Sequence, residues 1–331
     1  MKLFTLVALL ASLALFAAAC GSDTSASVEA AAEAAAAEAE EAMADDAMED
    51  EEHSDDAMAD EDAMEDEEAM ADDETMRIVS ISPTSTEMLF AVGAGDLVVA
   101  VDSFSYFPAE APVTDLSGFE PNVEAIAGYE PTVVFSSFPV EGLDALGIEN
   151  MVLPAAVSFD DVYAQIEQVG AATGHVGEAA EVVANMQTDI AAVIDTLPER
   201  EVPLTYYHEL DPTLYSVTSD TFIGEVYTLL GLVSAVDAAD PDGAAFGYPQ
   251  LTEEYLVTAD PDIIFLADTI CCEQTAETVA ARAGWDQLSA VQAGNVVELN
   301  DDTVSRWGPR LVEFIETAGN AIAAIEAVPA S

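Results

Sequence analysis

The feature that most constrains the fold is a pattern of helix, turn and strand that occurs twice in the chain. Residues 123–127 carry a short amphipathic helix pattern, and residues 130–135 continue it with a proline turn and a β-branched run. The same order returns 130 residues later, with a helix pattern at 253–257 and a turn and β-branched run at 260–265. Apolar β-branched runs bounded by turn residues are typical of buried strands. The recurrence predicts two lobes of related build.

A second pair of segments agrees with this division. Glu87 precedes Gly93 by six residues in an apolar run that begins a helix, and Glu225 precedes Gly231 by the same six residues. The two segments lie 138 residues apart, close to the spacing of the first repeat. A strand pattern at 78–80 comes before the first of them, so strands alternate with helices, and this alternation favours largely parallel sheets. We therefore predict an α/β fold of two similar lobes.

The longest helical pattern lies between the repeats. Residues 178–197 contain no glycine or proline, their apolar side chains follow helical spacing, and Pro198 closes the run. One long helix joining two lobes is a stiff bridge, so we expect small relative motion of the lobes on binding. The expected boundaries are 77–175 for the N-terminal lobe, 176–198 for the bridging helix and 199–331 for the C-terminal lobe.

The beginning of the chain carries the pattern of an export signal. Lys2 precedes an uncharged apolar run at 3–19, which is short for a membrane-spanning helix and ends in small residues before Cys20. Residues 17–21 are similar to a bacterial lipobox, whose cysteine is acylated and becomes the first mature residue. We predict a signal peptide at 1–19 and a lipid on Cys20 that anchors the exported protein to the outer face of the cell membrane. The alternative is ordinary cleavage, which leaves the Cys20 thiol free.

Residues 20–76 form an acidic segment of different composition. They hold 24 of the chain's 65 acidic residues and no lysine or arginine, in repeats of alanine, methionine and acid. Such a segment repels itself and has too little apolar surface to offset the entropy of ordering. We predict a flexible stalk between the lipid and the folded lobes. The alternative for the regularly spaced methionines is soft-metal binding.

The charge and the motifs of the remaining chain exclude several functions. Its 41 acidic residues face five arginines and no lysine, which argues against nucleic acid and against docking on an anionic bilayer by charge. No Gly-x-Ser-x-Gly, phosphate-binding Gly-Lys-Ser/Thr or His-Glu-x-x-His motif is present. The chain has three histidines, His53, His175 and His208, which are too widely separated to predict a site of several imidazoles around a free metal ion.

Five segments resemble one known family. Residues 77–87, 121–126 and 130–134 are similar to the first lobe of helical-backbone (class III) periplasmic substrate-binding proteins, and residues 221–225 and 307–310 are similar to the second lobe. These proteins serve ABC importers for iron–siderophore complexes, haem and cobalamin. The resemblance implies a monomeric receptor, not an enzyme, that captures a metal chelate between its lobes and delivers it to the importer's membrane subunits. It implies no cofactor of the protein's own, because the iron or cobalt belongs to the ligand.

The resemblance also implies a role for two echoed glutamates. Glu87 and Glu225 match the family positions that pair, one per lobe, with arginines of the importer's membrane subunits. Two exposed carboxylates on a rigid body would fix its orientation on that partner. The alternative is that each is a carboxylate favoured by the dipole of its helix. Two other functions stay open: a surface receptor for a sensor or adhesion system, and a hydrolase built on His208.

Ligand contacts are expected from aromatic and polar side chains in loops that face each other across the lobes. Arg306 would hold an anionic group of the ligand, unless it forms an ion pair within the protein. His208 would offer a nitrogen to the ligand's metal, unless it is a core histidine. The candidates are Tyr106, Phe107 and Phe119 in the first lobe, and His208, Tyr215, Phe246, Tyr248, Arg306 and Trp307 in the second.

Cys271 and Cys272 are adjacent and follow the strand pattern at 263–266. With Cys20 lipidated, they are an even pair in an oxidising compartment, and this favours a disulfide between them. A bridge of this kind would form a small rigid knob beside the cleft. The alternative is that the two thiolates bind a metal ion.

Overall fold

The computed structural model describes residues 76–325. The predicted signal peptide, Cys20 and the acidic stalk up to residue 75 lie outside the described residues, as does His53. Within them, no helix is long and apolar enough to cross a membrane.

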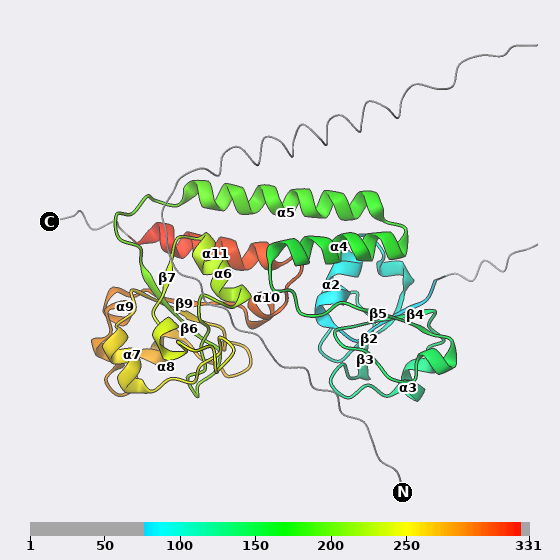
Figure 1. Ribbon diagram of the computed structural model, residues 1–331, viewed down its shortest axis with the longest axis horizontal. Helices are drawn as coiled ribbons and strands as arrows, with labels where there is room; N and C mark the ends of the chain where they lie inside the picture. The colour runs from blue at the N-terminus through cyan, green and yellow to red at the C-terminus, as the bar shows by residue number, and fades with distance from the viewer. Residues whose placement is uncertain (1–75, 326–331) are drawn as a thin grey trace, which may run out of the picture. The chain divides into compact units, whose positions relative to one another are not determined.

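The first lobe is built on a parallel sheet in the order β3-β2-β1-β4-β5. Helices α2, α3 and α4 connect or follow these strands (Figure 1). The strands are β1 (Ile78–Ser80), β2 (Val98–Asp102), β3 (Val113–Leu116), β4 (Val133–Ser136) and β5 (Glu149–Val152). The helices are α2 (Pro83–Ala91), α3 (Val123–Ala127) and α4 (Phe159–Thr173), with short 3-10 turns at Gly95–Leu97 and Asp144–Leu146.

The second lobe repeats this plan with a parallel sheet in the order β7-β6-β8-β9. The strands are β6 (Thr205–Glu209), β7 (Val233–Ser234), β8 (Ile263–Leu266) and β9 (Val296–Glu298). The helices are α6 (Phe222–Leu229), α7 (Glu253–Ala259), α8 (Ala276–Ala280), α9 (Ser289–Ala293), α10 (Asp301–Ser305) and α11 (Leu311–Ala324), with 3-10 turns at Asp237–Ala239 and Trp285–Gln287.

The register of the two sheets confirms the prediction of related lobes. Ser80 of β1 pairs with Phe135 of β4, and at the same place in the second lobe His208 of β6 pairs with Phe265 of β8. Both helix–turn–strand repeats form as predicted, as α3 with β4 and as α7 with β8. The predicted α/β fold with parallel sheets is therefore confirmed.

Equivalent helices in the two lobes begin with the same capping chemistry. The Ser82 and Thr221 hydroxyls accept hydrogen bonds from the third residue of α2 and α6, and Asn122 and Thr252 do the same for α3 and α7. Such a side chain satisfies a backbone N–H that has no partner inside the helix. Each cap thus fixes the point at which the chain turns from a strand end or loop into a helix.

The long helix predicted between the repeats is α5, which runs from Val176 to Thr196. It packs against α4 of the first lobe and α11 of the second (Figure 1). One core cluster contains residues of both sheets and of α5, including Phe135, Ile190 and Phe265. Because the apolar core is continuous from lobe to lobe, the helix bridges the lobes as a packed element and not as a free linker.

Candidate functional site

A cavity of about 630 Å³ opens at the carboxyl ends of the first-lobe strands. Ligands of open parallel α/β sheets bind at this edge, because the loops after the strands converge there. The lining includes residues 81–84 after β1, Asp102 and Phe104 at the end of β2, 137–138 after β4 and 153–156 after β5. Residues 305–307 of the second lobe complete it, so both lobes contribute to one site.

Exposed aromatic rings surround this cavity. Phe104, Phe119 and Phe138 line it and expose 52%, 82% and 69% of their surface, values that are high for phenylalanine. Phe104 and Phe119 meet edge to face, with ring centroids 6.0 Å apart. Exposed apolar surface gathered around a concavity is typical of a site that closes on an apolar partner.

Asp102 is the carboxylate within this lining, and it is almost completely buried. Its Oδ1 accepts a hydrogen bond from the Phe104 N–H at 2.9 Å. Burial raises the pKa of the Asp102 carboxyl, against the opposing influence of Ser105, the Phe104 N–H and Arg306. Gly118 allows this close packing, because a Cβ at that position would overlap the Ile81 carbonyl oxygen and lie 3.2 Å from Asp102 Oδ2.

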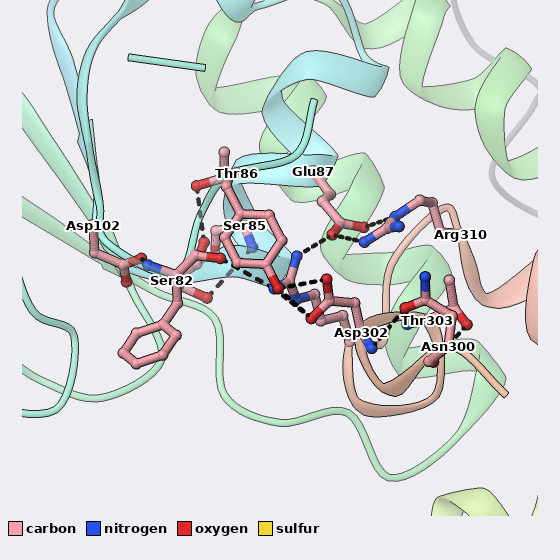
Figure 2. Close-up of polar contacts among 12 residues, drawn as sticks. Ser82, Ser85, Thr86, Glu87, Asp102, Asn300, Asp302, Thr303 and Arg310 are labelled. Atoms are coloured by element: carbon pink, nitrogen blue, oxygen red, sulfur yellow. Dashed lines mark hydrogen bonds and ion pairs between the residues drawn. The ribbon is translucent and has the colours of Figure 1, made fainter. Parts of the chain in front are cut away.

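An ion cluster joins the lobes beside the cavity (Figure 2). Glu87 Oε1 of α2 accepts hydrogen bonds from Arg306 Nη1 at 2.9 Å and Arg310 Nη2 at 2.6 Å. Arg306 Nη2 donates to Asp302 Oδ1 at 2.8 Å, and the Tyr106 hydroxyl donates to Asp302 Oδ2 at 2.7 Å. Charges from α2, α10 and the segment after α10 therefore fix the two lobes against each other.

The expectation that Glu87 is an exposed carboxylate is wrong, whereas its docking to an importer stays a prediction. Glu87 is 3% exposed, and its carboxylate is held by Arg306 and Arg310 of the same chain. An importer arginine would have to displace these two partners. Glu225, at the equivalent place on α6, is partly buried, and burial together with Asp160 and Asp161 raises its pKa.

Five of the predicted ligand residues lie at or beside the cavity. Phe119, Arg306 and Trp307 line it. Tyr106 and Phe107 flank the ion cluster, with the guanidinium of Arg306 5.0 Å from the Tyr106 ring and that of Arg310 3.9 Å from the Phe107 ring. Arg306 is 7% exposed and forms ion pairs within the protein, with Glu87 and Asp302, as the alternative to anion binding expected.

The three other second-lobe aromatics are exposed, but they do not line this cavity. Tyr215, Phe246 and Tyr248 expose 40%, 87% and 37% of their surface. Tyr215 pairs in an isolated bridge with Gln250. These side chains are available at the surface of the second lobe without being gathered into the site.

The expectation that His208 reaches the ligand is wrong. It is fully buried in β6, where its Nδ1 lies 2.8 Å from the Tyr227 hydroxyl. Burial lowers the pKa of His208 to about 3. The hydrolase alternative depended on His208 as its catalytic residue. Because His208 has no exposed surface, a substrate in the cavity cannot contact it. The neighbouring Glu209 is also buried and is held by both terminal nitrogens of Arg282 at 2.6 Å.

Cys271 and Cys272 are joined by a disulfide in the loop after β8. The Asp301 carboxylate accepts hydrogen bonds from the backbone N–H groups of Thr269, Ile270 and Cys271. This ties the disulfide loop to the start of α10, although neither cysteine lines the cavity. The disulfide knob is thus attached to the helix that carries Asp302 of the ion cluster.

Four parts of the site were not predicted: Asp102, Phe138, Gln165 and the segment 153–156. Asp102 and the residues after β4 and β5 follow buried strand patterns. Parallel strands end at one edge of a sheet, where ligands bind. The residues that follow each predicted strand were therefore the ones to choose as site candidates. Selecting loops by their aromatic residues alone instead gave Tyr215, Phe246 and Tyr248, which do not line the cavity.

Comparison with known proteins agrees with this architecture. The profile of a family described as periplasmic binding protein matches residues 78–303. The chain belongs to this family. It is 30% identical over 259 residues to an uncharacterised ABC transporter substrate-binding lipoprotein, YvrC, of Bacillus subtilis, covering 74% of this chain and 79% of that protein. It is 32% identical over 259 residues to a cobalamin-binding protein of Halobacterium salinarum, covering 74% of this chain and 69% of that protein.

Solved structures show the same fold. The periplasmic vitamin B12 binding protein BtuF of Vibrio cholerae superposes with a TM-score of 0.59 at 24% identity, covering 76% of this chain and 98% of that one. The periplasmic haem binding protein HutB of Vibrio cholerae gives a TM-score of 0.64 at 22% identity, covering 74% of this chain and 98% of that one. The predicted family is confirmed, and each of these relatives and neighbours bears the name of a binding protein. Membership of a periplasmic family agrees with a location outside the cytoplasm.

Proposed function

We propose that this protein is the extracytoplasmic receptor of an ABC importer, and that it captures a metal chelate in the cavity described above. The chelate is a ferric siderophore, haem or a cobalamin, the ligand classes named among the relatives and neighbours. The observation that carries the proposal is the aromatic cavity at the strand ends, closed on one side by residues 305–307 of the other lobe. A large chelate with an apolar face needs such a surface.

Direct binding tests this proposal. The described domain would be dialysed against cyanocobalamin, haemin and ferrioxamine B, with the bound chelate measured by its visible absorbance. We expect at least one to bind with a dissociation constant in the micromolar range or below. Failure of all three chelates to bind would contradict the proposal.

A pair of variants tests whether the cavity is the binding site. Phe119→Ala removes an exposed ring from the lining, and we expect binding to weaken by about tenfold, the usual scale for one stacked aromatic side chain. Phe246→Ala is the matched control, because Phe246 is equally exposed but lies outside the lining. Equal losses in the two variants would contradict the assignment of the cavity.

Delivery to the importer is proposed to use Glu225, the more accessible of the two family docking positions. Its carboxylate is partly exposed at the start of α6, where a cation of the membrane subunits can reach it. Glu225→Arg should lower uptake of the chelate by the cell while leaving binding by the isolated protein unchanged. Glu254→Arg, an exposed acid on α7, is the control. Unchanged uptake in the Glu225 variant would contradict docking through this carboxylate.

The N-terminal segment is proposed to tether this receptor. Residues 1–19 would direct export, a lipid on Cys20 would hold the protein at the membrane, and residues 20–76 would act as the stalk below lobes at 77–175 and 199–331. Cys20→Ser should release the protein into the soluble extracytoplasmic fraction, which fractionation and mass spectrometry of the mature N-terminus would detect. Retention of the variant in the membrane would contradict the lipid anchor.

A further inference from the structure

The first observation is a carboxyl group in the second lobe that has no hydrogen-bond donor. Asp268 lies just after β8 and is fully buried, and within residues 76–325 neither oxygen of its side chain has a hydrogen-bond partner. A carboxylate ion in this position would be costly, because a buried charge needs donors or an opposite charge. Asp268 therefore fits its surroundings as a neutral acid and not as an ion.

The second observation is that a neighbouring carboxylate already holds the available donors. Glu209 of β6 is fully buried and lies within hydrogen-bonding reach of Asp268. Its two oxygens accept from the terminal nitrogens of Arg282 at 2.6 Å, and Oε2 also accepts from the Tyr207 hydroxyl at 3.1 Å. Because a carboxylate offers about four acceptor positions, Glu209 can accept one more hydrogen bond.

One proton between the two carboxyl groups accounts for this arrangement. Two adjacent carboxylates repel each other, whereas a protonated one donates a hydrogen bond to the other. Burial and the charge of Glu209 raise the pKa of Asp268 to about 8, against the opposing influence of Arg282. The other titratable groups that act on Asp268 are Tyr207 and Asp301, and neither supplies a positive charge. Asp268 is therefore the member that carries the proton in neutral solution.

Asp268 is also the first residue of the disulfide loop, which comprises residues 268–275. Its backbone carbonyl oxygen accepts the Gln274 N–H at 3.2 Å, and this hydrogen bond closes the loop. The Gln274 side chain in turn accepts from Arg282 Nη2 at 2.7 Å. One guanidinium thus holds both Glu209 and the loop. If Asp268 were ionised, it would be a second buried carboxylate competing for that guanidinium.

We propose that Asp268 and Glu209 share one proton, and that this proton fastens the disulfide loop to the second-lobe sheet. In neutral solution the Asp268 hydroxyl donates to Glu209, and Arg282 keeps its present partners. In alkaline solution the proton leaves to the solvent, Asp268 competes for Arg282, and the loop loosens. The loop is tied to α10 through Asp301, and α10 leads into residues 305–307 of the cavity wall. This pH-sensitive device goes beyond the proposed function and does not depend on it.

The variant Asp268→Asn tests the shared proton. An asparagine amide can donate to Glu209 as the protonated acid does, but it cannot ionise. Because folding raises the pKa of Asp268, its contribution to stability is complete below about pH 4 and is lost as pH rises through about 8. The melting temperature of the unmodified protein should therefore fall relative to that of the variant by about 5 °C or more between pH 5 and pH 9.

A matched control and a second measurement keep this test decisive. Asp286→Asn changes an exposed acid of the same lobe, and its melting temperature should follow that of the unmodified protein. Melting temperatures of Asp268→Asn that also run parallel to the unmodified protein would overturn the inference. If Asp268→Asn does not fold, infrared spectroscopy of the unmodified protein replaces it. The band of a protonated carboxyl group should be present at pH 7 and absent at pH 10, and its absence at pH 7 would overturn the inference.

Amide hydrogen exchange tests whether the proton fastens the loop. The N–H groups of residues 269–271 are held by the Asp301 carboxylate. At pH 9 they should exchange about tenfold faster in the unmodified protein than in Asp268→Asn, because the loop opens more often once Asp268 is ionised. Equal exchange rates in the two proteins at this pH would overturn the proposed fastening of the loop.

Discussion

Glu87 holds two guanidinium groups across the lobe interface, and all three side chains are nearly removed from water. The exposed fractions of the side chains alone are 1% for Glu87, 8% for Arg306 and 12% for Arg310. Removing such charges from water costs several kcal/mol, which the ion pairs offset only when their geometry is good. The cluster therefore specifies how the lobes meet more than it adds net stability.

The replacement Glu87→Gln should be strongly destabilising. It leaves two buried arginines without their carboxylate, and loss of one partner of a buried pair costs about 3–5 kcal/mol. Urea unfolding would measure this loss. Glu225→Gln, at the equivalent position of the second lobe, is the control and should change the free energy of unfolding by less than about 1 kcal/mol. Comparable losses in the two variants would contradict the structural role assigned to Glu87.

His208 should make the stability of the protein depend on pH. Its pKa in the folded state is about 3, below the ordinary value of 6.5, so its contribution is complete above pH 6.5 and is lost as pH falls toward 3. Between pH 7 and pH 5 this loss amounts to about 2 kcal/mol. His208→Gln should therefore lose about 2 kcal/mol less than the unmodified protein over that interval. Urea titrations at both pH values measure the difference, and identical losses would contradict it.

Two glycines determine how closely the lobes pack on α5. A Cβ at Gly170 of α4 would overlap Ala179 Cβ, and a Cβ at Gly319 of α11 would overlap Val193 Cγ1. Both Ala179 and Val193 belong to α5, so each lobe meets the bridging helix through a residue without a side chain. This close approach explains how one helix can be shared as part of both cores.

Gly319→Ala should destabilise the protein, although alanine is the better helix former. Overpacking of this kind typically costs about 1–3 kcal/mol, which exceeds the gain of about 1 kcal/mol in helix propensity. Gly177→Ala is the matched control on α5, because a Cβ there meets no atom within 4 Å. It should stabilise the protein by up to about 1 kcal/mol. Thermal unfolding of the two variants measures both effects, and a stabilised Gly319 variant would contradict the packing argument.

The elements that could be predicted from the sequence are those with a strong local period. The α5 helix and the α3–β4 and α7–β8 units follow patterns contained in fewer than 25 residues each. Burial of Glu87 could not be predicted in this way, because its partners lie 219 and 223 residues away. A glutamate in a short helix pattern gives the same sequence signal whether solvent or an arginine from the other lobe faces it. Asp102 could be predicted in part. It ends the strand β2, which has a clear apolar pattern, but the other loops that form the cavity with it come from distant parts of the sequence.

At the scale of the whole molecule, the charge balance should make stability depend on salt. The chain has a formal net charge of −59, and of the five arginines in the described domain three form ion pairs and two donate to backbone carbonyl groups. Repulsion among the remaining surface carboxylates destabilises the compact state and is screened by salt. The melting temperature should rise by several degrees between about 0.05 M and 1 M NaCl, where the Debye length falls to about 3 Å. Sucrose at equal osmolality is the control, and a melting temperature that does not respond to salt would contradict this account.

The placement of the two tryptophans gives the protein an optical signal of its own. Trp307 is partly exposed in the cavity lining, whereas Trp285 is fully buried in the second lobe, with the Arg282 guanidinium 4.6 Å from its ring. A ligand that fills the cavity replaces water around the first indole, while the second has no water to lose. Emission from the unmodified chain therefore contains both a reporter of occupancy and an internal reference, and no dye needs to be attached to follow capture and release.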